Sequence, residues 1–331
     1  MLIRYLYTLL RALVTLLVLL AFSFLLTRLA YRNPAAMLAP INATQEVIDG
    51  IAVSLRLNDP WWQQLWQYFY RGPEIQGAPM GLVNWPPALG YSFRKQAPVT
   101  DLILDKLPAT LSLVAGAAFI WLTLSILAGV WAARHRGRWQ DLLSGGLACV
   151  AMSVPVLLSG ILLSYFLFYL PTRAGWPIFP SSGYVPLTQD PWEWARHLAL
   201  PWATLVLIEV GTFQRVVRGA VLDAMGHDYI RTARAKGLSE TAVHFNHALS
   251  AALNPIITLG ALEIGTLLGG AVVTETIFGI DGLGRLAIAS ALDGDFPVVI
   301  GTTIVAGAGI ILMTSLGDLL VQARERRPSV L

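Results

Sequence analysis

The sequence predicts an all-α membrane protein of six transmembrane helices, with both termini in the cytoplasm and a long cytoplasmic loop. Composition predicts the membrane class, because 55% of the residues are hydrophobic and only 13% are charged, whereas soluble domains carry about 25% charged residues. The chain also contains six apolar stretches of the length, roughly 20 residues, that a helix needs to cross the hydrocarbon layer. Such stretches must be helical, because lipid offers no partners to free backbone polar groups.

The first predicted span follows Arg4 and Arg11, which resemble the start of a secretory signal. Its apolar run is too long for a signal core and no small-x-small cleavage site follows, so we expect an uncleaved span. Pro155 lies inside the third span, where a kink is expected and no gating role is assigned. The six spans are Leu6–Thr27, Thr110–Ala132, Leu142–Leu170, Leu198–Val217, Pro255–Phe278 and Val298–Val321.

Basic residues predict the orientation of these spans. If the N-terminus is cytoplasmic, the cytoplasmic segments hold 13 Lys and Arg in 70 residues, and the opposite segments hold 10 in 128. This difference follows the positive-inside rule, so both termini are expected in the cytoplasm. The predicted parts are a first helix (1–30), an extracytoplasmic subdomain (31–105), a five-helix core (106–322) with a cytoplasmic loop (215–254), and a cytoplasmic tail (323–331).

The predicted subdomain 31–105 contains Trp61, Trp62, Trp66 and Trp85, too many tryptophans for a disordered linker. Residues 59–69 predict a short amphipathic helix with Pro60 at its start. Its aromatic side chains are suited to the membrane–water interface. Contact with an extracytoplasmic partner is an alternative that is compatible with this anchoring.

The loop 215–254 contains a short basic helical run that begins at Asp228 and stops at Gly237, a residue suited to a left-handed helix cap. Ser239 is the expected N-cap of a second helical run, although Ala242 at the third position after it excludes a capping box. A helix bounded by a glycine elbow is suited to a groove on another protein. The alternative is a basic loop that only sets topology.

The segment DYIRTARAKGL, Asp228 to Leu238, resembles the cytoplasmic coupling loop of the dipeptide/oligopeptide branch of binding-protein-dependent ABC transporter permeases. The segments GYSFR at 90–94 and LPATL at 107–111 are similar to the family's entry into the second span. GGAVVTETIF at 269–278 and GLGR at 282–285 resemble its signature after the fifth span. The chain departs from the family at Ser250 and Ala251, where Arg-Asn is usual.

The resemblance implies a permease subunit that does no chemistry itself, in the inner membrane of a bacterium. Its loop would form coupling helices that sit in a cleft of a cytoplasmic ATPase. The implied partners are a second homologous permease subunit, two ATP-binding subunits, an extracytoplasmic solute-binding protein and membrane lipid. The implied coupling residues are Asp228, Tyr229, Arg231, Ala233, Arg234, Lys236, Gly237 and Leu238, and the family signature comprises Phe278, Gly282, Leu283 and Gly284.

Three carboxylates, Glu209, Glu263 and Glu275, lie within predicted spans. An ionisable residue deep in a span is costly and usually faces a cavity or a partner. One hypothesis is that Glu209 and Glu263 line the path and favour a cationic solute, such as a basic peptide. The alternative is structural pairing or protonation in place. Glu275, near the outer end of the fifth span, matches the family's own pattern and is a third candidate path residue.

Other classes of function have less support in the sequence. No G-x-x-x-x-G-K-[ST] phosphate loop is present, so ATP hydrolysis is expected in separate subunits and no cofactor is predicted. His244 and His247 supply only two ligands, too few for a metal site. A formal charge of +3 gives no case for nucleic-acid binding. A nickel or other small-solute permease of the same family remains an alternative, as does an autonomous secondary transporter, although no internal repeat supports the latter.

Overall fold

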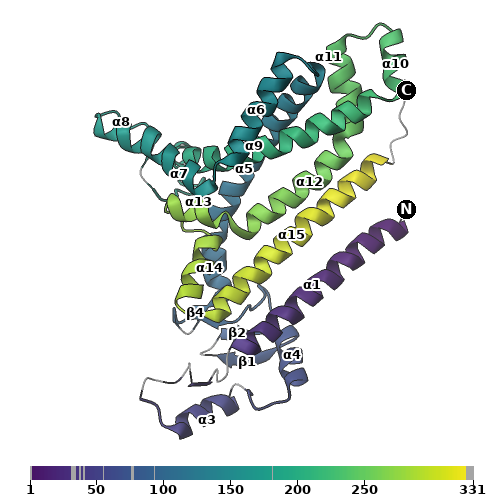
Figure 1. The fold of residues 1–331 in the computed structure, drawn as a ribbon. Helices are drawn as coiled ribbons and strands as arrows, with labels where there is room; N and C mark the ends of the chain where they lie inside the picture. The colour runs from purple at the N-terminus through teal and green to yellow at the C-terminus, as the bar shows by residue number, and fades with distance from the viewer. Residues whose placement is uncertain are drawn as a thin grey trace.

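Long helices run side by side in an elongated bundle in the computed structural model (Figure 1). The structure describes residues 2–30, 35–36, 39, 42–54, 56–75, 78–92, 94–180 and 182–325. The helices are α1 (Leu2–Ala30), α3 (Gln45–Ser54), α4 (Trp61–Phe69), α5 (Val99–Arg134), α6 (Trp139–Ser153), α7 (Val156–Leu163), α8 (Leu170–Arg173), α9 (Pro191–Met225), α10 (Asp228–Ala235), α11 (Glu240–Ala242), α12 (Leu249–Gly270), α13 (Val272–Ile277), α14 (Leu283–Leu292) and α15 (Phe296–Glu325).

The two ends of the bundle differ (Figure 1). The described ends of the chain, the start of α1 and the end of α15, lie at the same end as α10 and α11, the end predicted to be cytoplasmic. At the opposite end lie α3, α4 and two antiparallel hairpins, β1 (Gly72–Ile75) with β2 (Ala78–Met80) and β3 (Tyr91–Ser92) with β4 (Ala97–Pro98). The register places Gly72 opposite Met80 and Tyr91 opposite Pro98. The amphipathic helix expected at 59–69 is confirmed as α4, which begins after Pro60.

Four of the six predicted spans each lie within one long helix, α1, α5, α9 or α15. Five helical segments are long and apolar enough to cross a membrane: 6–26, 99–134, 156–173, 240–269 and 296–325. The remaining predicted span, Leu198–Val217, lies within the 35-residue α9, whose polar residues make it less apolar than the others. Asp190 caps the start of α9 by accepting hydrogen bonds from the backbone N–H groups of Trp192 and Glu193, and Pro191 occupies the first turn.

Two predicted spans are interrupted. The third is not one kinked helix, because α6 ends at Ser153 and α7 begins at Val156. Pro155 has no N–H to donate, and it forces Val154 into an extended conformation with φ −92° and ψ 120°. The fifth span is likewise divided at Ala271, between α12 and α13. The predicted tail 323–331 begins as the end of α15, and its residues 326–331 lie outside the described part.

Small residues allow α9 to pack closely against its neighbours. A Cβ atom on Gly129 of α5 would lie 2.7 Å from the Val217 side chain, so this glycine permits the α5–α9 contact. Nearby, the rings of Trp121 and Phe213 meet edge to face with centroids 4.7 Å apart. At the cytoplasmic end, Arg218 of α9 binds both carboxylate oxygens of Asp141 of α6, at 2.6 and 2.7 Å. The α5–α9 pair therefore forms the centre of the core, and the Arg218–Asp141 pair joins α6 to it.

The helices α12, α15 and α1 form a second layer. Gly265 of α12 packs against Ile310 of α15, where an added Cβ would lie 3.0 Å from the Ile310 Cα. The absence of a side chain at Gly265 therefore allows α12 and α15 to pack closely. The long edge helix α1 packs along α15, and an Arg11–Asp318 ion pair of 2.5 Å joins the two helices. Most of the α1 surface is exposed apolar side chain, as lipid contact requires.

We predict opposite effects for two alanine substitutions in α9. In Gly211→Ala, the new Cβ would lie 2.8 Å from the Ala148 carbonyl oxygen, whereas nothing lies within 4 Å of a Cβ at Gly219. Overpacking should lower stability by about 1–3 kcal/mol at Gly211. Gly219→Ala should leave stability unchanged or raise it by up to ~1 kcal/mol, because alanine is the better helix former. The thermal unfolding midpoints of both variants would test this, and equal midpoints would contradict the packing described.

Candidate coupling site and translocation path

The basic run predicted in the cytoplasmic loop forms α10, which ends in a glycine cap. The Gly237 N–H donates to the Arg234 carbonyl (2.9 Å) and the Leu238 N–H donates to the Ala233 carbonyl (3.4 Å), the two bonds of a Schellman motif. Gly237 has φ +78°, and there is open space where a Cβ atom would lie. Glycine is therefore favoured here by backbone conformation and not by crowding, and the predicted elbow is confirmed.

One face of α10 packs inward. Ile230 and Ala233 are buried in the protein's own core, and the hydroxyl of the half-buried Tyr229 donates to the Ala224 carbonyl (3.3 Å). Burial also raises the pKa of this phenol. The small size of Ala233 thus permits close approach of α10 to its own bundle. The prediction that Ala233 offers a contact surface to a partner does not agree with this placement.

The other face of α10 is open to solvent. Asp228, Arg231, Lys236 and Leu238 are all exposed. Asp228 and Arg231 form an ion pair of 3.4 Å, but their side chains are 93% and 80% exposed, so the pair contributes little to stability. The outward surface therefore combines two cationic side chains, one of them paired with Asp228, and one apolar side chain at the elbow.

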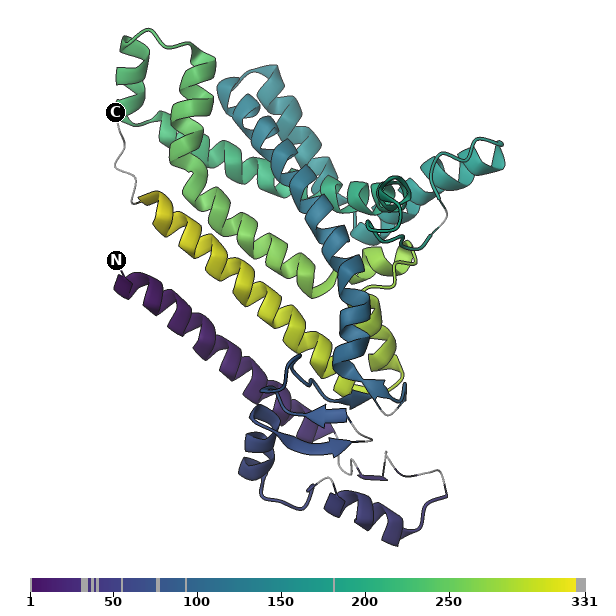
Figure 2. The same cartoon turned by 180° about the vertical axis from the view of Figure 1, so that it is seen from behind.

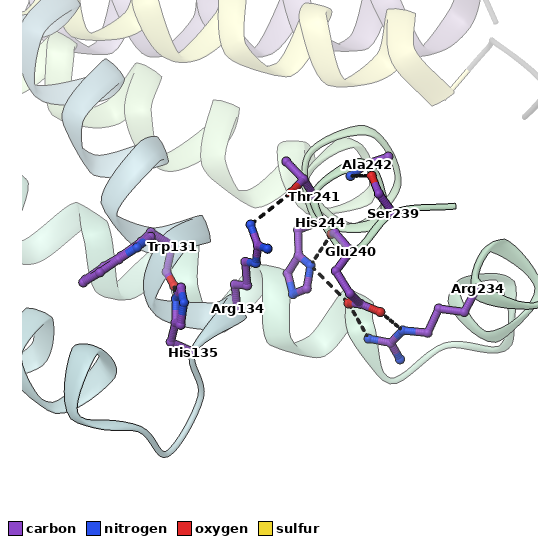
Figure 3. Close-up of polar contacts among 9 residues, drawn as sticks. All are labelled: Trp131, Arg134, His135, Arg234, Ser239, Glu240, Thr241, Ala242 and His244. Carbon is purple, nitrogen blue, oxygen red and sulfur yellow. Dashed lines mark hydrogen bonds and ion pairs between the residues drawn. The ribbon is translucent and has the colours of Figure 1, made fainter. Parts of the chain in front are cut away.

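A set of polar contacts fixes the position of α10 (Figure 3). The Arg234 guanidinium donates to both oxygens of Glu240, at 2.8 and 3.2 Å, across the glycine elbow. Ser239 caps the next helix by accepting from the Ala242 N–H (3.3 Å), which confirms the predicted N-cap. The guanidinium of Arg134, at the end of α5, donates to the hydroxyl of Thr241 (3.0 Å).

We call these contacts, made by Arg134, Arg234, Glu240 and Thr241, the tether. It joins α10 to the cytoplasmic end of α5 and to the helix that leads into α12 (Figure 3). The buried His244 strengthens the start of that helix, because its Nδ1 donates to the Glu240 carbonyl (2.7 Å). Sequence reasoning missed Arg134, Glu240 and Thr241, since no local motif marks them. A movement of α10 would therefore be transmitted through the tether to α5 and to the helix that leads into α12.

Glu209 borders a cavity of about 140 Å³ within the bundle. The cavity lies between α7, α9, α12 and α13, and its other lining residues are Val156, Leu205, Ile208, Leu267, Ala271, Val273 and Thr274. Glu263 of α12 is the charged neighbour of Glu209, and the Thr266 hydroxyl donates to the Glu263 backbone carbonyl at 2.8 Å. The structure thus brings together the two carboxylates that the sequence left in separate spans.

Glu275 has a different environment. It is fully buried, and its carboxylate accepts hydrogen bonds from the Thr110 hydroxyl and the Arg285 N–H, both at 2.8 Å. The Leu283 N–H also donates to the Thr110 hydroxyl (2.8 Å). A Cβ on Gly282 would lie 2.5 Å from the carboxylate. Glu275 thus holds the connection between α13 and α14 together and does not face an open path, contrary to its prediction as a path residue.

The remaining signature residues also have packing roles. A Cβ on Gly284 would lie 2.6 Å from the Val272 side chain. Phe278 is buried, and its carbonyl accepts from the Gly183 N–H (3.0 Å), which joins the loop before α9 to the end of α13. Among the residues that the structure describes, no group of three or more His, Cys, Asp and Glu side chains is arranged to hold a metal ion.

Family models match nearly the whole chain. The model described as "Binding-protein-dependent transport system inner membrane component" matches residues 125–330. The model described as "Binding-prot-dependent transport system membrane comp, N-term" matches residues 1–114. The tether, the cavity carboxylates and the buried Glu275 unit all lie within these matched ranges.

Curated relatives are similar over most of their length. A putative peptide transport system permease protein of Brucella suis is 37% identical, over 92% of this chain and 92% of the relative. The glutathione transport system permease protein of Escherichia coli strain K12 is 32% identical, over 91% and 90%. The inward-facing methionine ABC transporter MetNI matches with a TM-score of 0.53 and 17% identity, over 69% of this chain and 98% of that chain. This last likeness shows the fold alone.

We predict that Glu240→Ala loosens α10 without unfolding the bundle. Loss of the two hydrogen bonds to Arg234 should speed amide hydrogen exchange over residues 228–238 about fivefold, as expected for ~1 kcal/mol of local stability. The matched control is Arg231→Ala, which removes only the exposed pair with Asp228. Exchange that is equally fast in both variants would show that the tether does not hold α10.

Proposed function

Because the chain belongs to the family of inner membrane components of binding-protein-dependent transport systems, we propose that it is the permease subunit of an ATP-driven importer of peptides. The observation that carries the proposal is α10, a capped helix held by the tether with a basic face open to solvent. The relatives are named as peptide and glutathione transport permeases, and these names support peptides as the substrate class.

In this proposal α10 is the coupling helix. Arg231, Lys236 and Leu238 would contact a cleft on a cytoplasmic ATP-binding subunit, and the cationic groups would meet acidic side chains there. Closure of two ATP-binding subunits on ATP would push α10. Because Arg134 and Glu240 connect α10 to α5 and to the helix leading into α12, that push would be transmitted to the helices around the cavity.

A second, homologous permease subunit would complete the translocation path. An extracytoplasmic solute-binding protein would deliver the solute at the end where α3, α4 and the hairpins lie. Glu209 and Glu263 would face the path and favour cationic peptides. The support for this is that Glu209 lines the cavity and that Glu263 is close enough to interact with it electrostatically. Glu275 is excluded from this role by its burial and hydrogen bonds.

Charge reversal on the exposed face of α10 should uncouple transport. In reconstituted vesicles that contain the whole transporter, Arg231→Glu/Lys236→Glu should lower ATP-driven peptide uptake by about tenfold, because repulsion would replace attraction at the interface. The matched control is Arg136→Glu/Arg138→Glu, which reverses two exposed cytoplasmic charges in the turn between α5 and α6. Equal loss of uptake in both double variants, or none in either, would argue against coupling through α10.

The charge preference of the path can be measured separately. Glu209→Gln/Glu263→Gln should weaken uptake of lysine-containing peptides about tenfold and leave uptake of neutral peptides of equal length within about twofold, because only cationic solutes gain from the carboxylates. Competition between the two peptide classes in vesicles gives both values. Equal loss for both classes would leave these residues with a structural role only.

A further inference from the structure

A groove of about 490 Å³ lies on α4, at the end of the bundle away from the chain termini. Two arginines, one acidic residue and two tryptophans line it, together with two glutamines: Arg56, Asp59, Trp62, Gln63, Trp66, Gln67 and Arg71. The proposed transport function uses none of these residues. Their combination of cationic and indole groups on one surface indicates a binding site.

The turn before α4 is fixed to the helix by side-chain hydrogen bonds. The Gln64 amide donates to the carbonyls of Leu57 (2.8 Å) and Asp59 (2.7 Å). The Gln67 amide donates to the Asp59 carboxylate (3.1 Å). These bonds hold the turn that carries Arg56 against one side of α4. Arg71 follows the C-terminal end of α4, and both arginines line the same groove.

The two tryptophans of the groove, Trp62 and Trp66, are one helical turn apart and therefore lie on the same face of α4. Both are exposed. Trp66 also stacks on the ring of Tyr70, with centroids 5.8 Å apart. The groove thus combines an apolar aromatic wall, which has polar N–H edges, with two cationic side chains.

The opposite face of α4 packs on α1, which sets the depth of the groove. The Tyr68 ring lies against Phe24 of α1, with ring centroids 5.7 Å apart. Leu25 and Leu26 of α1, next along the chain, are exposed apolar side chains near the outer end of this lipid-facing helix. The groove is therefore beside the outer boundary of the hydrocarbon layer. Figure 2 shows α4 next to α1, while α3 forms the tip farther from the bundle.

The charges in the groove suit an anion. Arg56 and Arg71 are exposed, and neither forms an ion pair or side-chain hydrogen bond with any residue that the structure describes. With Asp59 they leave an excess of one positive charge. Guanidinium groups bind phosphate strongly, and tryptophan is enriched at the depth of lipid headgroups because one end of its ring is apolar and the other is polar.

We propose that this groove binds the headgroup of an outer-leaflet phospholipid. Arg56 and Arg71 hold its phosphate, and Trp62 and Trp66 pack against the glycerol and the first acyl carbons. Asp59 is placed to accept from the ammonium of an ethanolamine headgroup. A lipid fits better than a protein partner, because α4 packs on the lipid-facing helix α1, and the tip farthest from the bundle is formed by α3 and not by α4. The bound lipid would anchor α4 and the outer end of α1.

The test uses the whole transporter in nanodiscs that contain phosphatidylethanolamine with a photoreactive group near the headgroup. Illumination and peptide mass spectrometry should locate crosslinks within residues 56–71. Arg56→Gln/Arg71→Gln should reduce these crosslinks about tenfold, because the phosphate loses both charged donors. The control Arg94→Gln, which removes an exposed arginine outside the groove, should leave them unchanged.

Two results would overturn the proposal. One is equal crosslinking of the double variant and the control protein. The other is a groove that crosslinks to an extracytoplasmic protein and excludes the lipid probe. Thermal unfolding of the double variant checks that the bundle is intact, and Trp62→Leu/Trp66→Leu provides a second variant with both arginines retained. That variant should also lose crosslinks, and unchanged labelling would contradict the aromatic part of the site.

Discussion

The requirement that every backbone polar group be paired in lipid organises this molecule. It makes the spans continuous helices, and it allows breaks only where protein or a cavity surrounds the freed groups. The two breaks, at Pro155 and at Ala271, both border the cavity that contains Glu209. Broken helices and an intramembrane carboxylate thus meet at one place. That coincidence, more than either feature alone, makes the cavity the natural candidate for a solute path.

The cytoplasmic end depends on a different kind of interaction. Outside the membrane a short helix such as α10 has too few residues to be stable alone. Its buried Ile230 and Ala233, its glycine cap and its ion pair with Glu240 supply the missing stability. A rigid attachment is what a coupling element needs, because a flexible segment would absorb a push without passing it to the bundle.

Two carboxylates within the predicted spans, Glu275 and Glu209, have different surroundings and therefore different roles. Glu275 has its acceptors filled by Thr110 and a backbone N–H, so burial makes it a structural group that holds α13 and α14 together. Glu209 lines a cavity, so in the proposed function it is the carboxylate that a solute would meet. Hydrogen-bond satisfaction, and not position in the span, separates the two roles.

The sequence by itself determined the membrane class, four of the six spans as single helices, the amphipathic α4 and the capped helix ending at Gly237. All of these depend on local composition and on short-range backbone preferences. Only the tertiary structure decided that Ala233 faces inward, that Glu275 is enclosed, and that Arg134 meets Thr241, 107 residues away. The reason is that side-chain shapes set how packed helices cross, and so decide which residues of distant helices meet. The spacing of residues along the chain does not show which residues of distant helices will be in contact.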